Sequence, residues 1–233
     1  MSLVIRPAAS RGHFMIDWLN SRHSFSFGEY HDPDHMGFRS LRVINDDIVR
    51  AASGFDTHGH RDMEIITYVV RGAIGHRDTT GGEGVLRRGD VQVMSAGTGI
   101  RHSEINPSPD EEVRFLQIWV LPERRGFTPE YRQAHFDDAA KHNRLLTLVA
   151  PDGAAGALDV HQDVILSAGV LDPDVTVRYE LEPGRAAWVQ LVDGSVTIGG
   201  TRLNAGDGAA ITDITAIEIT ALTGAEILLF DLA

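Results

Sequence analysis

Short apolar runs, broken by glycine, aspartate and proline, recur along the whole chain of 233 residues. Runs of this length between turn residues are typical of β-strands, whereas helices show longer segments with a period near 3.6 residues. The pattern therefore predicts an all-β protein, built as a sandwich or barrel such as a jelly roll. The clearest runs cover residues 41–44, 65–70, 91–94, 115–121, 188–192, 214–219 and 227–232.

A short pattern occurs twice in the chain. Residues 69–74 and 86–90 form a strand, a glycine turn, a second strand and a Gly-Asp turn, and residues 191–196 and 203–207 repeat that order. Self-similarity of this kind indicates duplicated supersecondary structure. We therefore expect two copies of one β fold in a single chain.

A change of pattern marks the boundary between these copies. Residues 128–146 lack clear strand-like runs, and Thr128 and Pro129 resemble the N-cap and first turn of a helix. We therefore expect a helical linker, with an N-terminal domain over residues 1–135 and a C-terminal domain over residues 136–233.

Cysteine is absent, whereas histidine occurs 11 times, and the formal net charge is −12. The absence of cysteine excludes disulfides, thiolate zinc sites, iron–sulfur clusters and a cysteine nucleophile. The acidic charge argues against nucleic-acid partners, which need a basic face. Residues 136–233 carry 5 basic and 15 acidic residues, whereas residues 1–135 carry 16 basic and 18 acidic residues and nine histidines.

No apolar run has the length of a signal peptide or a membrane helix, so we expect a cytoplasmic protein without membrane contact.

Two pairs of metal-ligand residue types in the first half carry the candidate chemistry. His58 and His60 lie two residues apart, and His102 and Glu104 repeat that spacing, beginning 42 residues after His60. Alternate residues of a strand share one face, so neighbouring strands could direct all four side chains into one cavity. One pair alone also fits the solvent face of an edge strand, but a second pair would then be a coincidence. Imidazole and carboxylate ligands suit Fe(II), Mn(II), Ni(II), Cu(II) or Zn(II).

Longer stretches around these pairs resemble the pirin family of two-domain cupin proteins, or bicupins, nearly from end to end. The resemblance is carried by residues 18–27, 32–38, 42–47, 58–64, 94–104 and 159–163. Within that family, the chain is most similar to the bacterial members with quercetinase activity. The resemblance implies two tandem jelly-roll domains, of which only the N-terminal one holds a metal. It also implies that the metal ligands are His58, His60, His102 and Glu104.

Glu64 is a rival to Glu104 as the carboxylate ligand. The general cupin pattern places a ligand glutamate four or five residues after the second histidine and seven residues before a glycine. Glu64 meets the first spacing, but counting back from Gly72 places Ile65 in the second. Because a one-residue slip turns a strand side chain to the other face, we favour Glu104 as the ligand. Glu64 stays an alternative, and either Glu104 or Glu64 is the candidate catalytic group that accepts a substrate proton.

The resemblance further implies a metal-dependent dioxygenase of the quercetinase type, which opens the central ring of a flavonol with O₂ and releases carbon monoxide. The expected partners are a small flavonol-like aromatic substrate, O₂ and one divalent metal ion per chain, with Fe(II) favoured over Mn, Ni, Cu, Zn and Co. Phe55, Arg61 and Gln117 are the candidate substrate-binding residues. The alternative function is that of a regulatory pirin, whose metal tunes binding to transcription factors or metabolic enzymes as protein partners.

The remaining histidines lack the paired spacing. His142 and His161 are the only histidines of residues 136–233, so we expect no metal site in the C-terminal domain. His76 and the other unpaired histidines of the first half are expected to be hydrogen-bonded surface or loop residues.

Overall fold

The structure is a computed structural model that describes residues 2–233. It divides the chain into two compact units. The N-terminal unit comprises residues 12–135 and 158–162, and the C-terminal unit comprises residues 2–11, 136–157 and 163–233. This differs from the predicted division after residue 135 in two short segments. Residues 2–11 belong to the C-terminal unit, and residues 158–162 belong to the N-terminal unit.

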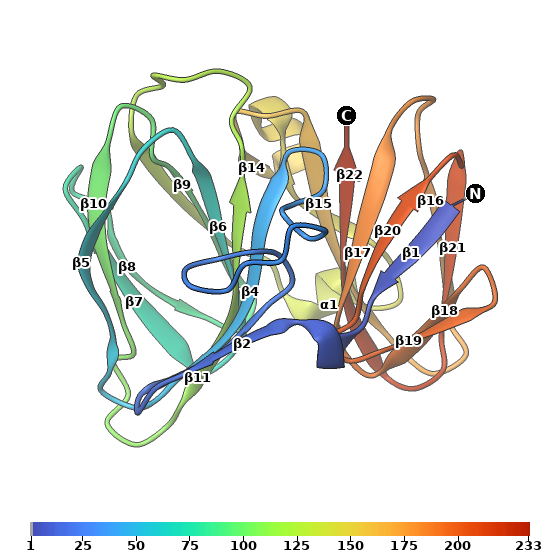
Figure 1. Ribbon diagram of the computed structural model, residues 1–233, viewed down its shortest axis with the longest axis horizontal. Helices are drawn as coiled ribbons and strands as arrows, with labels where there is room; N and C mark the ends of the chain where they lie inside the picture. Colours follow the sequence, from blue (N-terminus) through green and yellow to red (C-terminus); the bar gives the residue numbers. More distant parts are fainter. Residues whose placement is uncertain (1) are drawn as a thin grey trace. The chain divides into compact units, whose positions relative to one another are not determined.

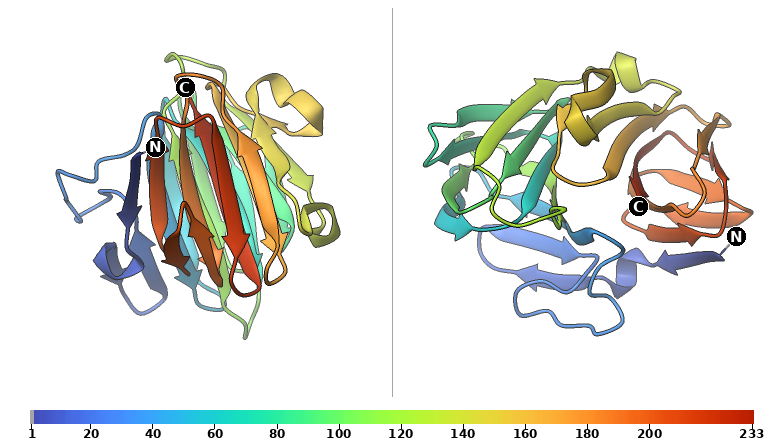
Figure 2. Two further views of the ribbon diagram at one scale, coloured as in Figure 1. Left: turned by 90° about the vertical axis from the view of Figure 1, so that its right-hand side faces the viewer. Right: turned by 90° about the horizontal axis from the view of Figure 1, so that it is seen from above.

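The N-terminal unit is a sandwich of two antiparallel sheets. The larger sheet has the order β12-β9-β6-β11-β4-β3-β2, and the smaller has the order β5-β10-β7-β8. Figure 2 (right) shows the blue to green strands of this unit curving around a common interior. The strands of the larger sheet are β2 (Gly12–Met15), β3 (Leu19–His23), β4 (Leu41–Val49), β6 (Glu64–Arg71), β9 (Asp90–Ser95), β11 (Val113–Val120) and β12 (Glu130–His135). The remaining strands of the unit are β5 (Gly54–His60), β7 (Ala73–Asp78), β8 (Glu83–Arg87), β10 (Ile100–Ile105) and β14 (Leu158–Asp159).

The interior of this unit is apolar at two levels and polar between them. Along β6, Ile65, Thr67 and Val69 share one face because strand side chains alternate. Ile65 and Val69 belong to two separate apolar clusters, whereas the buried Thr67 lies between them. The Thr67 hydroxyl donates to the Gln117 carbonyl oxygen at 3.2 Å, and buried Gln92 donates to Thr67 at 3.3 Å. Buried polar groups need hydrogen-bond partners, and these three side chains supply them to one another. The polar layer is therefore part of the folded core.

The C-terminal unit repeats the two-sheet architecture. The order β1-β20-β17-β22-β15-β13 runs through its larger sheet, and β16-β21-β18-β19 form its smaller sheet. Figure 1 shows the blue strand β1 beside the orange-red strands of this unit, where it pairs with β20. The strands of the larger sheet are β1 (Ser2–Arg6), β13 (Leu146–Ala150), β15 (Val164–Leu171), β17 (Ala186–Asp193), β20 (Gly208–Thr212) and β22 (Ala225–Leu232). The remaining elements of the unit are β16 (Thr176–Glu180), β18 (Ser195–Ile198), β19 (Thr201–Asn204), β21 (Ala216–Ala221), η1 (Ala8–Ser10), α1 (Asp138–Lys141) and η2 (Pro151–Gly156).

The two glycine turns of the predicted repeat occupy equivalent places. Gly72 joins β6 to β7 with φ +74°, and Gly194 joins β17 to β18 with φ +82°. A Cβ atom at Gly72 would lie 2.6 Å from a backbone carbonyl oxygen, and one at Gly194 would lie 2.1 Å from another. Both positions therefore require glycine for conformation and for space. The structure confirms the predicted repeat and the all-β, two-domain fold class.

The same repeat explains how the two interiors differ. When the two glycine turns are aligned, Val189 of β17 is the residue equivalent to Thr67 of β6. Val189 belongs to one continuous aliphatic cluster that fills the C-terminal unit, together with Ala187 and Leu191 of the same strand face. The C-terminal unit thus has hydrocarbon where the N-terminal unit has its polar layer.

The expectation of a helical linker at residues 128–146 is wrong for most of that stretch. Residues 130–135 form β12, which pairs with β9 along its full length, and α1 is a single turn. The Thr-Pro signal at residues 128 and 129 is local, whereas pairing with β9 satisfies a row of backbone groups that would otherwise be left open. No helix in the described residues 2–233 is long and apolar enough to cross a membrane.

Candidate metal centre

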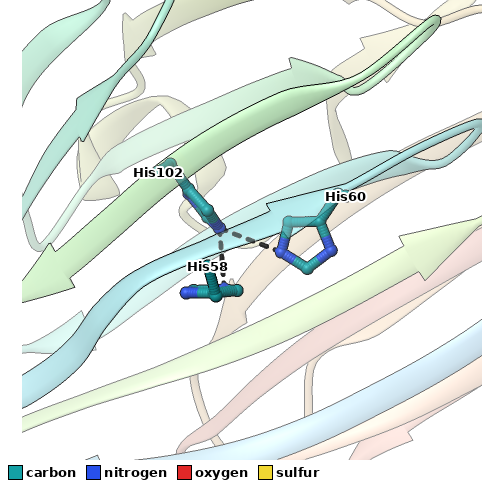
Figure 3. A group of neighbouring side chains, drawn as sticks. All are labelled: His58, His60 and His102. Atoms are coloured by element: carbon teal, nitrogen blue, oxygen red, sulfur yellow. Dashed lines mark hydrogen bonds between the residues drawn. The ribbon is translucent and has the colours of Figure 1, made fainter.

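Three imidazole rings converge inside the N-terminal unit. His58 and His60 lie on β5, and His102 lies on the neighbouring strand β10, directly opposite His58 in the register. The Nε2 atom of His102 lies 3.0 Å from the Nε2 atoms of both other rings (Figure 3). The predicted i, i+2 spacing therefore places both β5 imidazoles on the same face.

This donor set fits a divalent metal ion. The Nδ1 atom of His58 lies 2.8 Å from the Asp56 carbonyl oxygen, which can only accept, so Nδ1 carries the proton and Nε2 presents its lone pair. Burial, reinforced by the His58 imidazole, lowers the pKa of His60 to about 4. Burial and the neighbouring imidazoles likewise lower the pKa of His102 to about 2. Neutral imidazoles whose ring nitrogens converge in this way are suited to bind a metal ion. A cation accepts the lone pairs that the rings cannot all satisfy by hydrogen bonds to one another.

Glu104 lies on the same face of β10 as His102 and is 2% exposed. A register shift in β5 between the partners of His102 and Glu104 places Glu104 opposite Phe55. The Gln117 amide nitrogen donates to both carboxylate oxygens of Glu104, at 3.1 and 2.9 Å. Burial raises the pKa of Glu104 to about 7, although the hydrogen bonds from Gln117 and Thr67 oppose the rise. A carboxylate oxygen of Glu104 lies within 4.8 Å of ring nitrogens of His76 and His102.

His76 is a buried neighbour of this centre, so the expectation that it is a surface or loop residue is wrong. Its Nε2 atom lies 2.8 Å from Asp78 Oδ2, and its Nδ1 atom lies 3.4 Å from His102 Nδ1. The ring stacks on Tyr131 with centroids 4.5 Å apart. Burial lowers the pKa of His76, against the opposing effect of Asp78. The signal in the sequence was the spacing of His76 and Asp78, which is that of the two ligand pairs.

A cavity of about 640 Å³ opens beside the imidazoles, within the range of small-molecule sites. Phe55, Gln117 and Glu104 line it, together with His58 and His60. Aromatic rings form much of the remaining wall, with Trp119 centred 5.0 Å from the His60 ring and 5.3 Å from the Phe27 ring.

Asp47 of β4 also lines the cavity, and sequence reasoning missed it. Burial raises its pKa to about 7, in part opposed by a hydrogen bond with Ser21, while the nearby carboxylates of Asp46 and Glu104 add to the rise. Two buried carboxyl groups with raised pKa values in one cavity mark it as a candidate site. The run of Asn and Asp residues in an otherwise apolar strand was the only signal available.

Glu64 and Arg61 lie away from this cavity. Glu64 lies on the face of β6 opposite to Thr67, where it accepts a hydrogen bond from Ser95 at 2.8 Å and lies 3.4 Å from His161 Nδ1. Arg61 is exposed, with its guanidinium beside Gly99. In the described part of the chain, the cavity lining includes neither residue. His161 of the C-terminal half stacks on Phe127 at 3.9 Å, which matches a packing role.

A jelly-roll unit that gathers three histidines and a glutamate beside an internal cavity defines a cupin-type protein, and the second unit makes this chain a bicupin. Comparison with known proteins specifies the family. The pirin family model matches residues 4–120, and a model described as quercetinase C-terminal cupin domain matches residues 147–232. The chain therefore belongs to the pirin family.

Relatives cover the whole chain. Quercetin 2,3-dioxygenase of Escherichia coli strain K12 is 47% identical over 230 residues, which span 99% of this chain and 98% of that protein. The crystal structure of YhhW from Escherichia coli has a TM-score of 0.96 at 46% identity, covering 100% of this chain and 98% of that one. The crystal structure of the bacterial pirin YhhW in complex with nickel(II), also from Escherichia coli, has a TM-score of 0.94 at 45% identity and covers 99% of both chains.

Proposed function

We propose that this pirin is a metal-dependent dioxygenase that opens the central ring of a flavonol with O₂ and releases carbon monoxide. The observation that carries the proposal is the convergence of three neutral imidazoles beside a cavity of small-molecule size. The name of the 47% identical relative and the nickel complex of the similar structure support it. In this proposal the N-terminal domain, residues 1–135, holds the metal, and residues 136–233 hold none.

The proposed ligands are His58, His60, His102 and Glu104. When bound, the metal supplies a Lewis-acidic centre that can polarise a substrate oxygen and interact with O₂. Fe(II) is our favoured ion, and Mn, Ni, Cu, Zn and Co have the same ligand preferences to a large extent. Gln117 holds the Glu104 carboxylate in place from the neighbouring sheet.

The cavity walls indicate how a flat aromatic substrate would be held. Phe55, Trp119 and Phe27 offer rings for offset or edge-to-face packing, which favours an aromatic ligand over an aliphatic one of the same size. Glu104 lines the cavity and Glu64 does not, so we propose Glu104 as the group that accepts the substrate hydroxyl proton.

The test begins with protein purified without chelator. Elemental analysis should find one divalent metal per chain, and aerobic addition of quercetin should give O₂ uptake, loss of flavonol absorbance and carbon monoxide. Alanine at any of the four proposed ligands should remove most of the metal. Glu64→Ala is the matched control and should retain it, because Glu64 is a buried glutamate of the same unit outside the cavity.

Two results would contradict the proposal. Absence of turnover with each of the six metals would reject the dioxygenase function. Loss of metal in Glu64→Ala together with retention in Glu104→Ala would reject the ligand assignment.

A further inference from the structure

A chain of three buried side chains runs behind the imidazole cluster. Asp78 Oδ2 lies 2.8 Å from His76 Nε2, and His76 Nδ1 lies 3.4 Å from His102 Nδ1. The side chains of His76 and Asp78 are both 0% exposed. We call these residues the Asp78–His76–His102 chain; its last member presents Nε2 to His58 and His60.

In the Asp78–His76–His102 chain, the hydrogen bonds of Asp78 determine which ring nitrogen of His76 carries the proton. Asp78 Oδ1 already accepts from the Thr80 amide at 2.7 Å, the Thr80 hydroxyl at 2.6 Å and the Gly82 amide at 3.0 Å. The other oxygen, Oδ2, faces His76 and is an acceptor, so His76 Nε2 must carry the proton. A neutral imidazole has one N–H, which leaves the lone pair of His76 on Nδ1.

That lone pair fixes the next ring. Two facing ring nitrogens bond only if one donates and the other accepts, so the contact with His76 requires the proton of His102 on Nδ1. The Nε2 atom of His102 is then unprotonated, and it is the atom that meets the other two imidazoles. His58 reaches the same tautomer through the Asp56 carbonyl, so two of the three rings are set by acceptors behind them.

We propose that Asp78 and His76 are positioning residues that set the tautomer and orientation of His102 for metal binding. The proposal rests on the metal site described under the proposed function. Groups that hold a ligand histidine from behind change metal affinity by about 10–100-fold in other metalloproteins. We expect an effect of that size here, because the wrong tautomer places a proton on the ligating nitrogen.

Asp78→Asn is the sharpest perturbation. The three donors around Oδ1 keep the amide oxygen on their side, so the amide NH₂ faces His76 and donates to its Nε2. His76 then carries its proton on Nδ1, and His102 is driven to carry its proton on Nε2. An exchange of carboxylate for amide in the Ser-His-Asp triad of proteases inverts a histidine in the same way.

Asp90→Asn is the matched control, because Asp90 Oδ1 bonds His135 Nδ1 at 2.7 Å in the same unit, and His135 is an exposed ring. Nickel(II) affinity is measured by competition with a chelator for the wild type and both variants. Histidine tautomers are measured by long-range ¹H–¹⁵N NMR on the metal-free protein, which needs neither metal nor flavonol. The expected result is Nε2–H at His76 and Nδ1–H at His102 in the wild type, inverted in Asp78→Asn, with a 10–100-fold loss of nickel affinity only in that variant.

A second pair of variants separates the tautomer from packing. His76→Asn keeps an acceptor near the Nδ1 position but loses the stack on Tyr131, whereas His76→Phe keeps a ring and loses the acceptor. Nickel affinity should fall more in His76→Phe. Nε2–H at His102 in the wild type, or equal affinity of Asp78→Asn and Asp90→Asn, would overturn the proposal. If the wild type bound no nickel, the metal site itself would be rejected, while the NMR result would still decide the tautomers.

Discussion

The buried contact between Gln117 and Glu104 offers a quantitative test of the site. One amide nitrogen donates to both carboxylate oxygens, at 3.1 and 2.9 Å, and Gln117 and Glu104 are 8% and 2% exposed. Gln117→Leu keeps nearly the same volume and removes the donor. Because the pKa of Glu104 is raised to about 7, the carboxyl is mostly ionised at pH 8, where the test is made.

The expected cost follows from the hydrogen bonds lost. A buried hydrogen bond to a charged group contributes about 1.5–3 kcal/mol, and we count the two contacts as one because a single nitrogen serves both. The Thr67 hydroxyl loses its acceptor on Gln117 but keeps its bond from Gln92, which adds less than about 1 kcal/mol. The free energy of unfolding should therefore fall by about 2–4 kcal/mol, and Tm by about 4–16 °C for a chain of this size.

The assay is thermal and urea unfolding of the metal-free protein in chelator. Gln92→Leu is the matched control: it replaces a buried glutamine that donates to the neutral Thr67 hydroxyl, so it should cost about 1 kcal/mol. A double-mutant cycle with Glu104→Leu isolates the pair, and the double variant should be more stable than the sum of the single losses by at least about 1 kcal/mol. Additivity within about 0.5 kcal/mol would refute the reasoning.

Three further predictions concern the scaffold. Gly72→Ala should cost at least about 2 kcal/mol more than Gly81→Ala in unfolding experiments, because both glycines have positive φ but only the first Cβ meets a carbonyl oxygen; equal costs would contradict the clash. Arg185→Gln should lower stability by about 3 kcal/mol because it leaves the buried Asp231 carboxylate without its cation, and the added variant Asp231→Asn should recover part of that loss. Glu64→Ala should lower the urea midpoint by the equivalent of about 1–3 kcal/mol while metal content is unchanged, and a stable but metal-free variant would argue for a ligand role.

The sequence predicts the fold through patterns that repeat at short range. The strand-like runs at residues 65–70 and 115–121 correspond to β6 and β11, and the glycine turns at Gly72 and Gly194 reappear with positive φ. Both features depend on neighbours in sequence, namely alternation and turn geometry. The helix expected from Thr128 and Pro129 failed because the residues that follow, 130–135, pair with β9, which lies 35 to 45 residues earlier, and no local signal shows that the edge of β9 is open.

The site residues likewise fall into those that local spacing predicts and those that depend on contacts with distant strands. The i, i+2 spacing of His58 and His60 places both rings on one face, and the structure groups them with His102, whereas Glu104 groups with His102 and His76. His76 and Asp47 could not be ranked, because their importance arises from burial beside His102 and Glu104 on other strands. Arg61 follows His60 directly but lies beyond the last residue of β5, and its side chain is exposed.

The exchange of short segments between the two units bears on how such a protein can evolve. A break in the chain near residue 135 would leave β1 on the wrong fragment and would deprive the N-terminal unit of residues 158–162, which carry the His161 ring stacked on Phe127. Neither half can therefore be deleted or exchanged by a single break at that point. We expect the two copies, once duplicated, to be inherited as one piece, because each unit is completed by a segment from the other half of the sequence.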